Sequence, residues 1–151
     1  MRVYRLARPE YATTAFSGDG AVRAGGRWNR VGQRVVYTSS SVSLAVLEAL
    51  VHVERGGALP TMLLFTVDIP DSLAIESVTT TDLPGFPAVN EQMTRGVGTE
   101  WLRSGRTVAL VVPSAVVTLE SNILLNPSHP AFGSLVIGDP VPFTPDARLP
   151  R

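Results

Sequence analysis

Cysteine and lysine are both absent from this sequence of 151 residues, and only two histidines are present. Without cysteine, the chain forms no disulfide and offers no thiol nucleophile. Without lysine, it cannot form a Schiff base or use a lysine as a general base. His52 and His129 alone, with no cysteine to help them, argue against a zinc site, so no metal is expected at the functional site.

Long apolar runs and common nucleotide-binding motifs are missing too. No segment approaches the roughly 20 apolar residues that a membrane span needs, and the charged segment 1–11 lacks the apolar core of a secretion signal. We therefore expect a cytoplasmic protein that does not bind a membrane. The sequence has no G-x-x-x-x-G-K-[ST] loop, no G-x-G-x-x-G after a strand and no H-E-x-x-H pair. The formal net charge of zero argues against direct nucleic-acid binding.

Length and a hydrophobic content of 44% indicate one domain, residues 1–151, with a core over about 4–138 and a proline-rich tail over 139–151. Alternating or continuous apolar residues predict strands, the first of them at a sheet edge, over residues 2–6, 34–38, 62–69, 107–112, 116–120 and 135–137. Helical spacing and glycine- or proline-rich breaks predict helices over 42–55 and 90–104, the second interrupted by glycines, and loops over 17–29 and 70–89. This order is typical of an α+β domain with helices against a mixed sheet.

The basic residues are all arginines, and they crowd the start of the chain. Seven of the thirteen lie within the first 34 residues, where the only acidic residues are Glu10 and Asp19. A guanidinium suits bidentate contact with phosphate, so this arginine-rich N-terminal segment is compatible with binding of a small phosphorylated ligand. An ordinary solvated surface in an arginine-biased protein explains the same pattern, and composition favours that simpler explanation.

A polar stripe runs along the predicted helix 42–55. At about 100° per residue, Ser41, Glu48, His52 and Arg55 share one narrow face. The opposite face, expected to be core, would hold Val42, Val46, Ala49, Leu50 and Val53. The stripe is either a solvated face with a weak Glu48–His52 pair, or the wall of a cleft. In the second case Glu48 lies in a partly apolar collar, formed by Leu44, Ala45 and Val51, and faces a ligand cation.

Three further segments carry candidate functional residues. In Gly25–Asn29 (GGRWN), two glycines that allow close approach of the backbone precede an arginine, an indole and an amide. The segment is equally well interpreted as a ligand contact or as a turn before a buried tryptophan. Tyr37 ends a predicted strand and is either a cleft residue or a core tyrosine with its hydroxyl at the rim. Ser114 follows a proline at a strand end, and without a G-x-S-x-G turn it is not a nucleophile.

Taken together and in this order, five segments resemble the RES domain, a family named for arginine, glutamate and serine. The segments are GGRWN, VVYTS, LAVLEAL, VPS and N-x-L-L-N-P-x-H-P. The three residues of the family name correspond to Arg27, Glu48 and Ser114. The resemblance runs from Tyr4 to near the C-terminus and includes the segment GTEWL over 98–102.

The resemblance implies a fold similar to ADP-ribosyltransferases of the diphtheria-toxin type, with a split mixed sheet around a cleft for NAD⁺. It implies the toxin of a type II toxin–antitoxin pair that consumes NAD⁺ as substrate by hydrolysis or phosphorolysis, and it requires no cofactor. An Xre-type antitoxin with a DNA-binding helix-turn-helix region would block the cleft. A homodimer is expected within the complex.

The resemblance also assigns residues. Arg27, Tyr37 and Glu48 are the expected catalytic residues, and substrate contacts are expected from Arg27, Asn29, Tyr37, Ser114, Asn122 and Asn126, with the choice between the last two left open. In this interpretation Arg27 holds the diphosphate or a ribose, Tyr37 stacks on nicotinamide, and Glu48 stabilises an oxocarbenium-like ribose. Nicotinamide leaves as a neutral molecule, so no general acid is needed.

Two alternatives stay open at this point. The chain could transfer ADP-ribose to one host protein, or it could bind a nucleotide without cleaving it. A ribonuclease fits less well, because the net charge is zero and the two histidines form no visible acid–base pair.

Overall fold

The computed structural model of the chain describes residues 1–53, 59–88, 91–146 and 148–149. Within them, an eight-stranded mixed sheet has the order β4-β5-β6-β2-β1-β3-β7, and β8 also pairs with β3. The strands are β1 (Arg2–Ala7), β2 (Val36–Ser39), β3 (Met62–Asp68), β4 (Ile75–Ser77), β5 (Ala109–Pro113), β6 (Ser121–Leu125), β7 (Val136–Ile137) and β8 (Val141–Phe143). Among the pairs that these described strands form, β4–β5 is parallel and the others are antiparallel.

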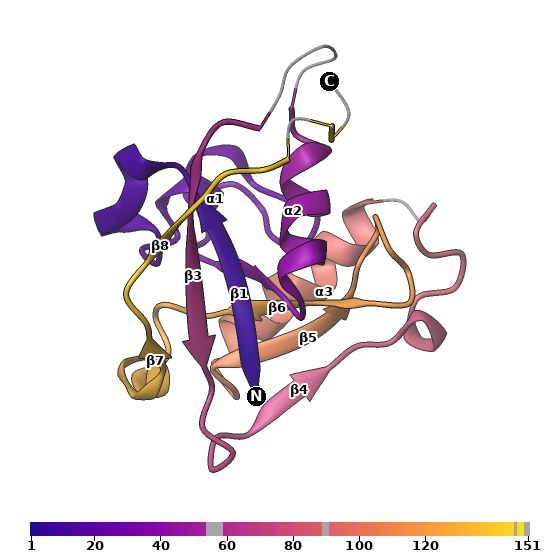
Figure 1. The fold of residues 1–151 in the computed structure, drawn as a ribbon. Helices are drawn as coiled ribbons and strands as arrows, with labels where there is room; N and C mark the ends of the chain where they lie inside the picture. Colours follow the sequence, from indigo (N-terminus) through magenta and orange to yellow (C-terminus); the bar gives the residue numbers. More distant parts are fainter. Residues whose placement is uncertain (54–58, 89–90, 147, 150–151) are drawn as a thin grey trace.

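The sheet is nearly split between β1 and β2. These two strands share a single pair of register partners, Tyr4 and Ser39, whereas β1 pairs with β3 along its whole length. In Figure 1, β1 and β3 run together while β5 and β6 cross them at a steep angle. A side-chain hydrogen bond of 2.7 Å from Arg5 to the Tyr37 carbonyl bridges β1 and β2 beyond their one pair. The α+β class and the split mixed sheet are therefore confirmed.

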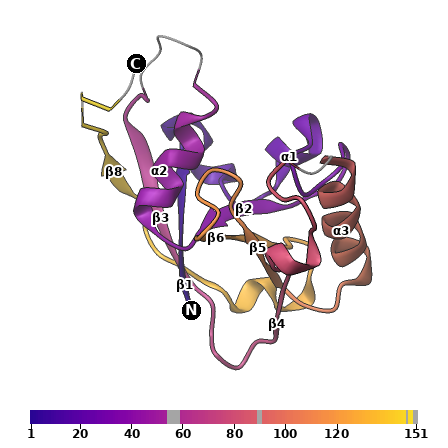
Figure 2. The ribbon, with the colours of Figure 1, turned by 90° about the vertical axis from the view of Figure 1, so that its right-hand side faces the viewer.

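In the described ranges, three α-helices pack around this sheet: α1 (Asp19–Ala24), α2 (Val42–Leu50) and α3 (Glu91–Ser104). Short 3₁₀ turns are η1 (Pro9–Thr14), η2 (Thr80–Asp82) and η3 (Pro130–Ser134). Figure 2 shows α2 on one side of the view and α1 with α3 on the other, with β2 and β6 between them. The ends of β2 and β6 therefore lie between the helices.

Two large apolar clusters lie on opposite faces of the central strands, and a smaller third cluster joins Ala7, Ala15 and Phe65. Ile123 and Leu125 of β6 join the cluster of Val3 and Val67, whereas Leu124, between them, joins the cluster of Trp101. This alternation is what a pleated strand buried on both faces requires. β6 is therefore a central strand of the core, and its Asn122 lies on the same face as Leu124.

Several predicted elements are wrong in extent or kind. The predicted edge strand is interior, because β1 pairs with β2 on one side and with β3 on the other. Its two arginines find partners there: Arg2 pairs with Asp68, and Arg5 donates to the Tyr37 carbonyl oxygen of β2. The predicted strand 116–120 is a turn that follows Pro113, and the strand is β6. Both predicted loops contain structure, namely α1 within 17–29 and β4 with η2 within 70–89.

The two predicted helices also differ from expectation. α2 ends at Leu50, well before the expected end at Arg55, which lies with Gly56 and Gly57 outside the described residues. α3 runs without interruption through its two glycines. One of them is needed for packing, since a Cβ on Gly98 would lie 1.8 Å from the carbonyl oxygen of Trp28. Asn90, where this helix was expected to begin, is likewise outside the described residues.

Candidate active site

One cavity of about 700 Å³ opens where β1 and β2 separate. Its walls come from β1, β2, α1 and the GGRWN segment, α2, the first turns of α3 and the turn after β5. A smaller cavity of about 170 Å³ adjoins it and shares the lining residues Arg5, Tyr37, Glu48, His52 and Asn122. The larger volume is in the range of cavities that hold small ligands and cofactors.

Glu48 lies at the junction of the two cavities. Ser41 caps α2 by accepting a hydrogen bond of 3.1 Å from the Leu44 amide, which places Glu48 two turns into the helix. Oε1 of Glu48 accepts hydrogen bonds from the Ser114 hydroxyl, at 2.8 Å, and from the side-chain amide of Asn122. Among the described residues nothing donates to Oε2. One carboxylate oxygen is therefore anchored and the other is available to the cavity.

The orientation of α2 decides between the two interpretations of its polar stripe. Leu44 and Ala45, one turn before Glu48, are buried, and Glu48 itself is half-buried at the cavity. The helix therefore forms a cleft wall, as the second interpretation held. Most of the expected core face is wrong: only Val46 is buried, and its other members, Val42, Ala49, Leu50 and Val53, are half-buried. The helix packs on the sheet through Leu44, Ala45 and Val46 instead, whereas Val51, the third residue of the expected collar, is exposed.

Tyr37 lines both cavities with its hydroxyl already engaged. The hydroxyl donates to Oδ1 of Asn29 at 2.8 Å and accepts from the backbone amide of Trp28 at 3.1 Å. Burial raises the pKa of Tyr37 to about 12. A Cβ on Gly26 would lie 2.5 Å from this hydroxyl, so glycine is needed there. The phenol is therefore a fixed part of the cavity wall and is neutral near neutral pH.

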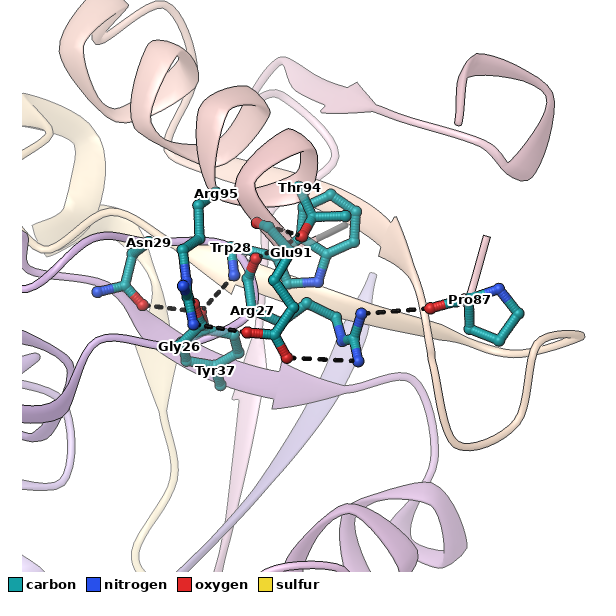
Figure 3. Close-up of polar contacts among 9 residues, drawn as sticks. All are labelled: Gly26, Arg27, Trp28, Asn29, Tyr37, Pro87, Glu91, Thr94 and Arg95. Carbon is teal, nitrogen blue, oxygen red and sulfur yellow. Dashed lines mark hydrogen bonds and ion pairs between the residues drawn. The ribbon is translucent and has the colours of Figure 1, made fainter. Parts of the chain in front are cut away.

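The GGRWN segment has mostly a structural role (Figure 3). Trp28 is 2% exposed and packs near Phe86, which confirms the buried-tryptophan interpretation. Asn29 is fully buried, and its amide nitrogen lies 2.9–3.3 Å from the backbone oxygens of Ala21, Arg30 and Gln33. Asn29 therefore does not line the cavity: its amide closes the turn and holds Tyr37, and its expected substrate contact stays a prediction.

Arg27 is the residue of this segment that reaches the cavity. It is half-buried, and its guanidinium lies 3.8 Å from Oε1 of Glu91 and 3.5 Å from the Pro87 carbonyl oxygen (Figure 3). The hydroxyl of Thr94 holds the Arg27 backbone oxygen at 2.7 Å. The backbone is thus tightly held, while the contacts that the guanidinium makes with the described residues are long ones that a ligand phosphate can replace.

Two cavity arginines were not named from the sequence. Arg5 was only one of a crowd of arginines, and no motif singled it out. Its Nη1 donates to β2, its Nε is buried without a partner among the described residues, and burial lowers its pKa to about 10, so it stays charged at neutral pH. Arg95 of α3 donates to the Gly26 carbonyl oxygen at 2.9 Å and pairs with Glu91 at 2.6 Å. Local sequence holds no signal for Arg95, because α3 reaches the cavity only through the tertiary fold.

The remaining predicted residues divide into one that faces the cavity and two that do not. Asn122 lines both cavities. Ser114 is fully buried and lines neither cavity, and within the described part of the chain its hydroxyl bonds to Glu48 and two backbone amides, so it is not a direct substrate contact in this geometry. Asn126 lies beyond the far end of β6, about 13 Å along the strand from Asn122, and its oxygen accepts from the Ser128 amide at 3.0 Å. It is a turn residue that lines neither cavity, and its expected substrate contact stays a prediction.

Comparisons with known proteins bear on this geometry. The model of the RES domain family matches residues 2–146. The chain is 42% identical over 128 residues to Toxin Res of Photorhabdus laumondii, covering 84% of this chain and 82% of that protein. It is 39% identical over 153 residues to Toxin Res of Yersinia enterocolitica, covering 99% of both. The chain therefore belongs to the RES domain family.

A third relative and one solved structure extend this finding. The Prs ADP-ribosylating toxin of a Sphingobium strain is 40% identical over 124 residues, covering 80% of this chain and 77% of that protein. A chain of the Mycobacterium tuberculosis MbcT–MbcA toxin–antitoxin complex has the same fold, with a TM-score of 0.71 over 95% of this chain and 84% of that one, at 21% identity.

Proposed function

We propose that this protein is the toxin of a toxin–antitoxin system and that it cleaves the nicotinamide–ribose bond of NAD⁺. The observation that carries the proposal is the arrangement of Glu48. It presents one free carboxylate oxygen in a ligand-sized cavity, while two donors hold the other oxygen. The three arginines that line the same cavity, Arg5, Arg27 and Arg95, suit a ligand with two phosphates.

The chemistry needs few groups. As the C1′–N bond breaks, the ribose becomes positively charged and nicotinamide leaves with the bonding electron pair as a neutral molecule. Oε2 of Glu48 stabilises that charge electrostatically, or holds a ribose hydroxyl. Water then attacks C1′ and loses a proton, which gives ADP-ribose, or phosphate attacks and gives ADP-ribose 1″-phosphate. The fixed ring of Tyr37 supplies a flat wall for the nicotinamide.

Product analysis tests the reaction directly. Purified protein is incubated with NAD⁺, with and without phosphate, and the products are resolved by mass spectrometry. Nicotinamide with ADP-ribose indicates hydrolysis, and the 1″-phosphate indicates phosphorolysis. NAD⁺ that binds but stays intact in both buffers and in cell extract overturns the proposal and leaves a non-catalytic nucleotide-binding module.

Glu48→Gln isolates the role of the charge. Both donors contact Oε1, so the amide variant can keep an oxygen at the anchored position while it loses the negative charge. We expect kcat to fall by about 10²–10³-fold, the usual effect of removing one electrostatic stabiliser. The control is Glu100→Gln, which alters an exposed glutamate of α3 outside the cavity.

A second candidate activity is transfer of ADP-ribose to a host protein. It is favoured by the relative named as an ADP-ribosylating toxin. It uses the same bond cleavage with a protein side chain as the acceptor. Radiolabelled NAD⁺ in cell extract would then label one protein band, with little nicotinamide released in the absence of extract.

A protein partner that covers the cavity is the third part of the proposal. Val51 and Val116 line the cavity and are exposed. Leu119, which lies with Val116 in the turn between β5 and β6, is 98% exposed. An Xre-type antitoxin that buries these side chains would block the cleft. Leu119→Asp should weaken binding of the co-expressed antitoxin without changing NAD⁺ cleavage. We also expect self-association, which light scattering of the purified chain tests.

A further inference from the structure

The anchored oxygen of Glu48 depends on a residue that does not touch Glu48. Asn122 donates to Oε1 through its amide nitrogen, and the opposite end of the same amide, Oδ1, accepts a hydrogen bond of 2.8 Å from the hydroxyl of Ser39. Ser39 is 4% exposed and Asn122 is 9% exposed, so both bonds are largely shielded from bulk water, and both residues line the smaller cavity. The three residues form one chain of hydrogen bonds that ends at the reacting carboxylate.

The chemistry of the groups decides which of them donates in each of these hydrogen bonds. An ionised carboxylate only accepts hydrogen bonds, so the nitrogen end of the Asn122 amide must face Glu48. The oxygen end must then face Ser39, and the Ser39 hydroxyl has to donate. A reversed amide would set an oxygen against a carboxylate oxygen, which is repulsive. Without Ser39, Oδ1 would be buried with no donor, and the amide would turn towards another partner.

The fold places these groups by strand register. Ser39 and Asn122 are direct partners in the antiparallel β2–β6 pair, with side chains on the same face. β2 and β6 are central strands, so the position of Asn122 relative to Ser39 is rigid. Glu48 comes from α2, a separate element, and the amide is one of two contacts that tie its carboxylate to the sheet side; the other is the hydroxyl of Ser114.

We propose that Ser39 is a positioning residue, which orients the Asn122 amide and thereby holds Oε1 of Glu48 so that Oε2 faces the substrate. This inference rests on the proposed function, because it assigns Glu48 the reacting role. Hydrogen bonds in a chain polarise one another, so the Ser39 bond also strengthens the donor at Glu48. Ser39 itself contacts no reacting atom.

The test combines single and double variants. We expect Ser39→Ala to lower kcat for NAD⁺ cleavage about tenfold, the effect of losing one hydrogen bond, while KM changes less than about twofold. Ser39→Thr keeps the hydroxyl and should restore most of kcat. If Ser39 acts only through Asn122, Ser39→Ala should have no further effect in an Asn122→Ala background.

A matched control separates positioning from general stability. Thr99 is buried, and its hydroxyl donates to Oε1 of Gln33 at 2.8 Å, the same kind of bond, away from the cavity. Thr99→Val should lower the melting temperature and leave kcat unchanged. An equal loss of kcat in both variants, or additive effects of Ser39→Ala and Asn122→Ala, would overturn the proposal.

A second readout does not depend on enzyme activity. The two side-chain amide protons of Asn122 should exchange slowly with solvent in the unaltered protein, as seen by nuclear magnetic resonance. They should exchange more than about tenfold faster in Ser39→Ala, because one of the two bonds that hold the amide is lost. Unchanged exchange refutes the positioning role, whereas absence of NAD⁺ cleavage with faster exchange refutes only the proposed function.

Discussion

Replacement of Ser114 by alanine should damage stability and catalysis together. Its hydroxyl donates to Oε1 of Glu48 at 2.8 Å and accepts from the backbone amides of Val116 and Val117, each at 3.0 Å. One small group thus fixes the carboxylate and the turn between β5 and β6 at the same time. The residue is fully buried, so water cannot take the place of the hydroxyl without rearrangement.

The magnitude follows from these three bonds. A hydrogen bond to a charged group contributes about 1.5–3 kcal/mol. The two amides contribute less, since Val116 is exposed and its amide can turn to water. We expect a loss of about 2–3 kcal/mol in the free energy of unfolding, which corresponds to about 4–12 °C in melting temperature for a chain of this size. Glu48 also loses one of its two anchors, so kcat should fall by about 10–100-fold.

The assay pairs thermal unfolding with NAD⁺ cleavage well below the melting temperature. Ser104→Ala is the control: its hydroxyl donates to the Trp101 carbonyl oxygen at 2.8 Å and accepts from the Arg106 amide, away from the cavity. It should lose stability and keep kcat. If Ser114→Ala matches the unaltered protein in kcat, then Oε1 is not held through this hydroxyl and the account of Glu48 fails.

Three other predictions test the surrounding structure. Gly98→Ala should prevent folding, because its Cβ would meet the Trp28 carbonyl oxygen, whereas Gly96→Ala in the same helix meets nothing within 4 Å and should add about 0.5–1 kcal/mol to stability in chemical unfolding. The pKa of Tyr37 is raised to about 12 from an ordinary value of 10.0. The contribution of this group to the free energy of unfolding is therefore complete below pH 10 and is lost as the pH rises towards 12. In urea titrations at pH 9–12, the free energy of unfolding of Tyr37→Phe should fall less with rising pH than that of the unaltered protein. The same pH dependence in both proteins would refute this prediction. Asn126→Ala should lower the melting temperature without changing KM for NAD⁺, and a raised KM would return this residue to the site.

Periodicity recovered most of the strands, because their apolar runs are local. It failed where a tertiary contact decides the outcome. The strand was expected over 116–120, but the buried Ser114 hydroxyl gathers two backbone amides and turns the chain, so pairing begins only at Ser121. The core face of α2 was also misplaced. It was set opposite the polar stripe, but a polar stripe that borders a cavity has the same spacing as one exposed to water, so spacing alone does not show which side packs on the sheet.

The order of motifs was enough to place the chain in its family and to name Arg27, Tyr37, Glu48 and Asn122, which share one cavity. Those residues stand in recognisable local patterns, so they can be found without coordinates. Only the tertiary structure decided that Asn29 and Asn126 are structural, that Arg5 and Arg95 reach the same cavity, and that Ser39 holds the amide beside Glu48. These roles depend on which hydrogen-bond partners distant segments bring together, and spacing along a chain carries no record of that.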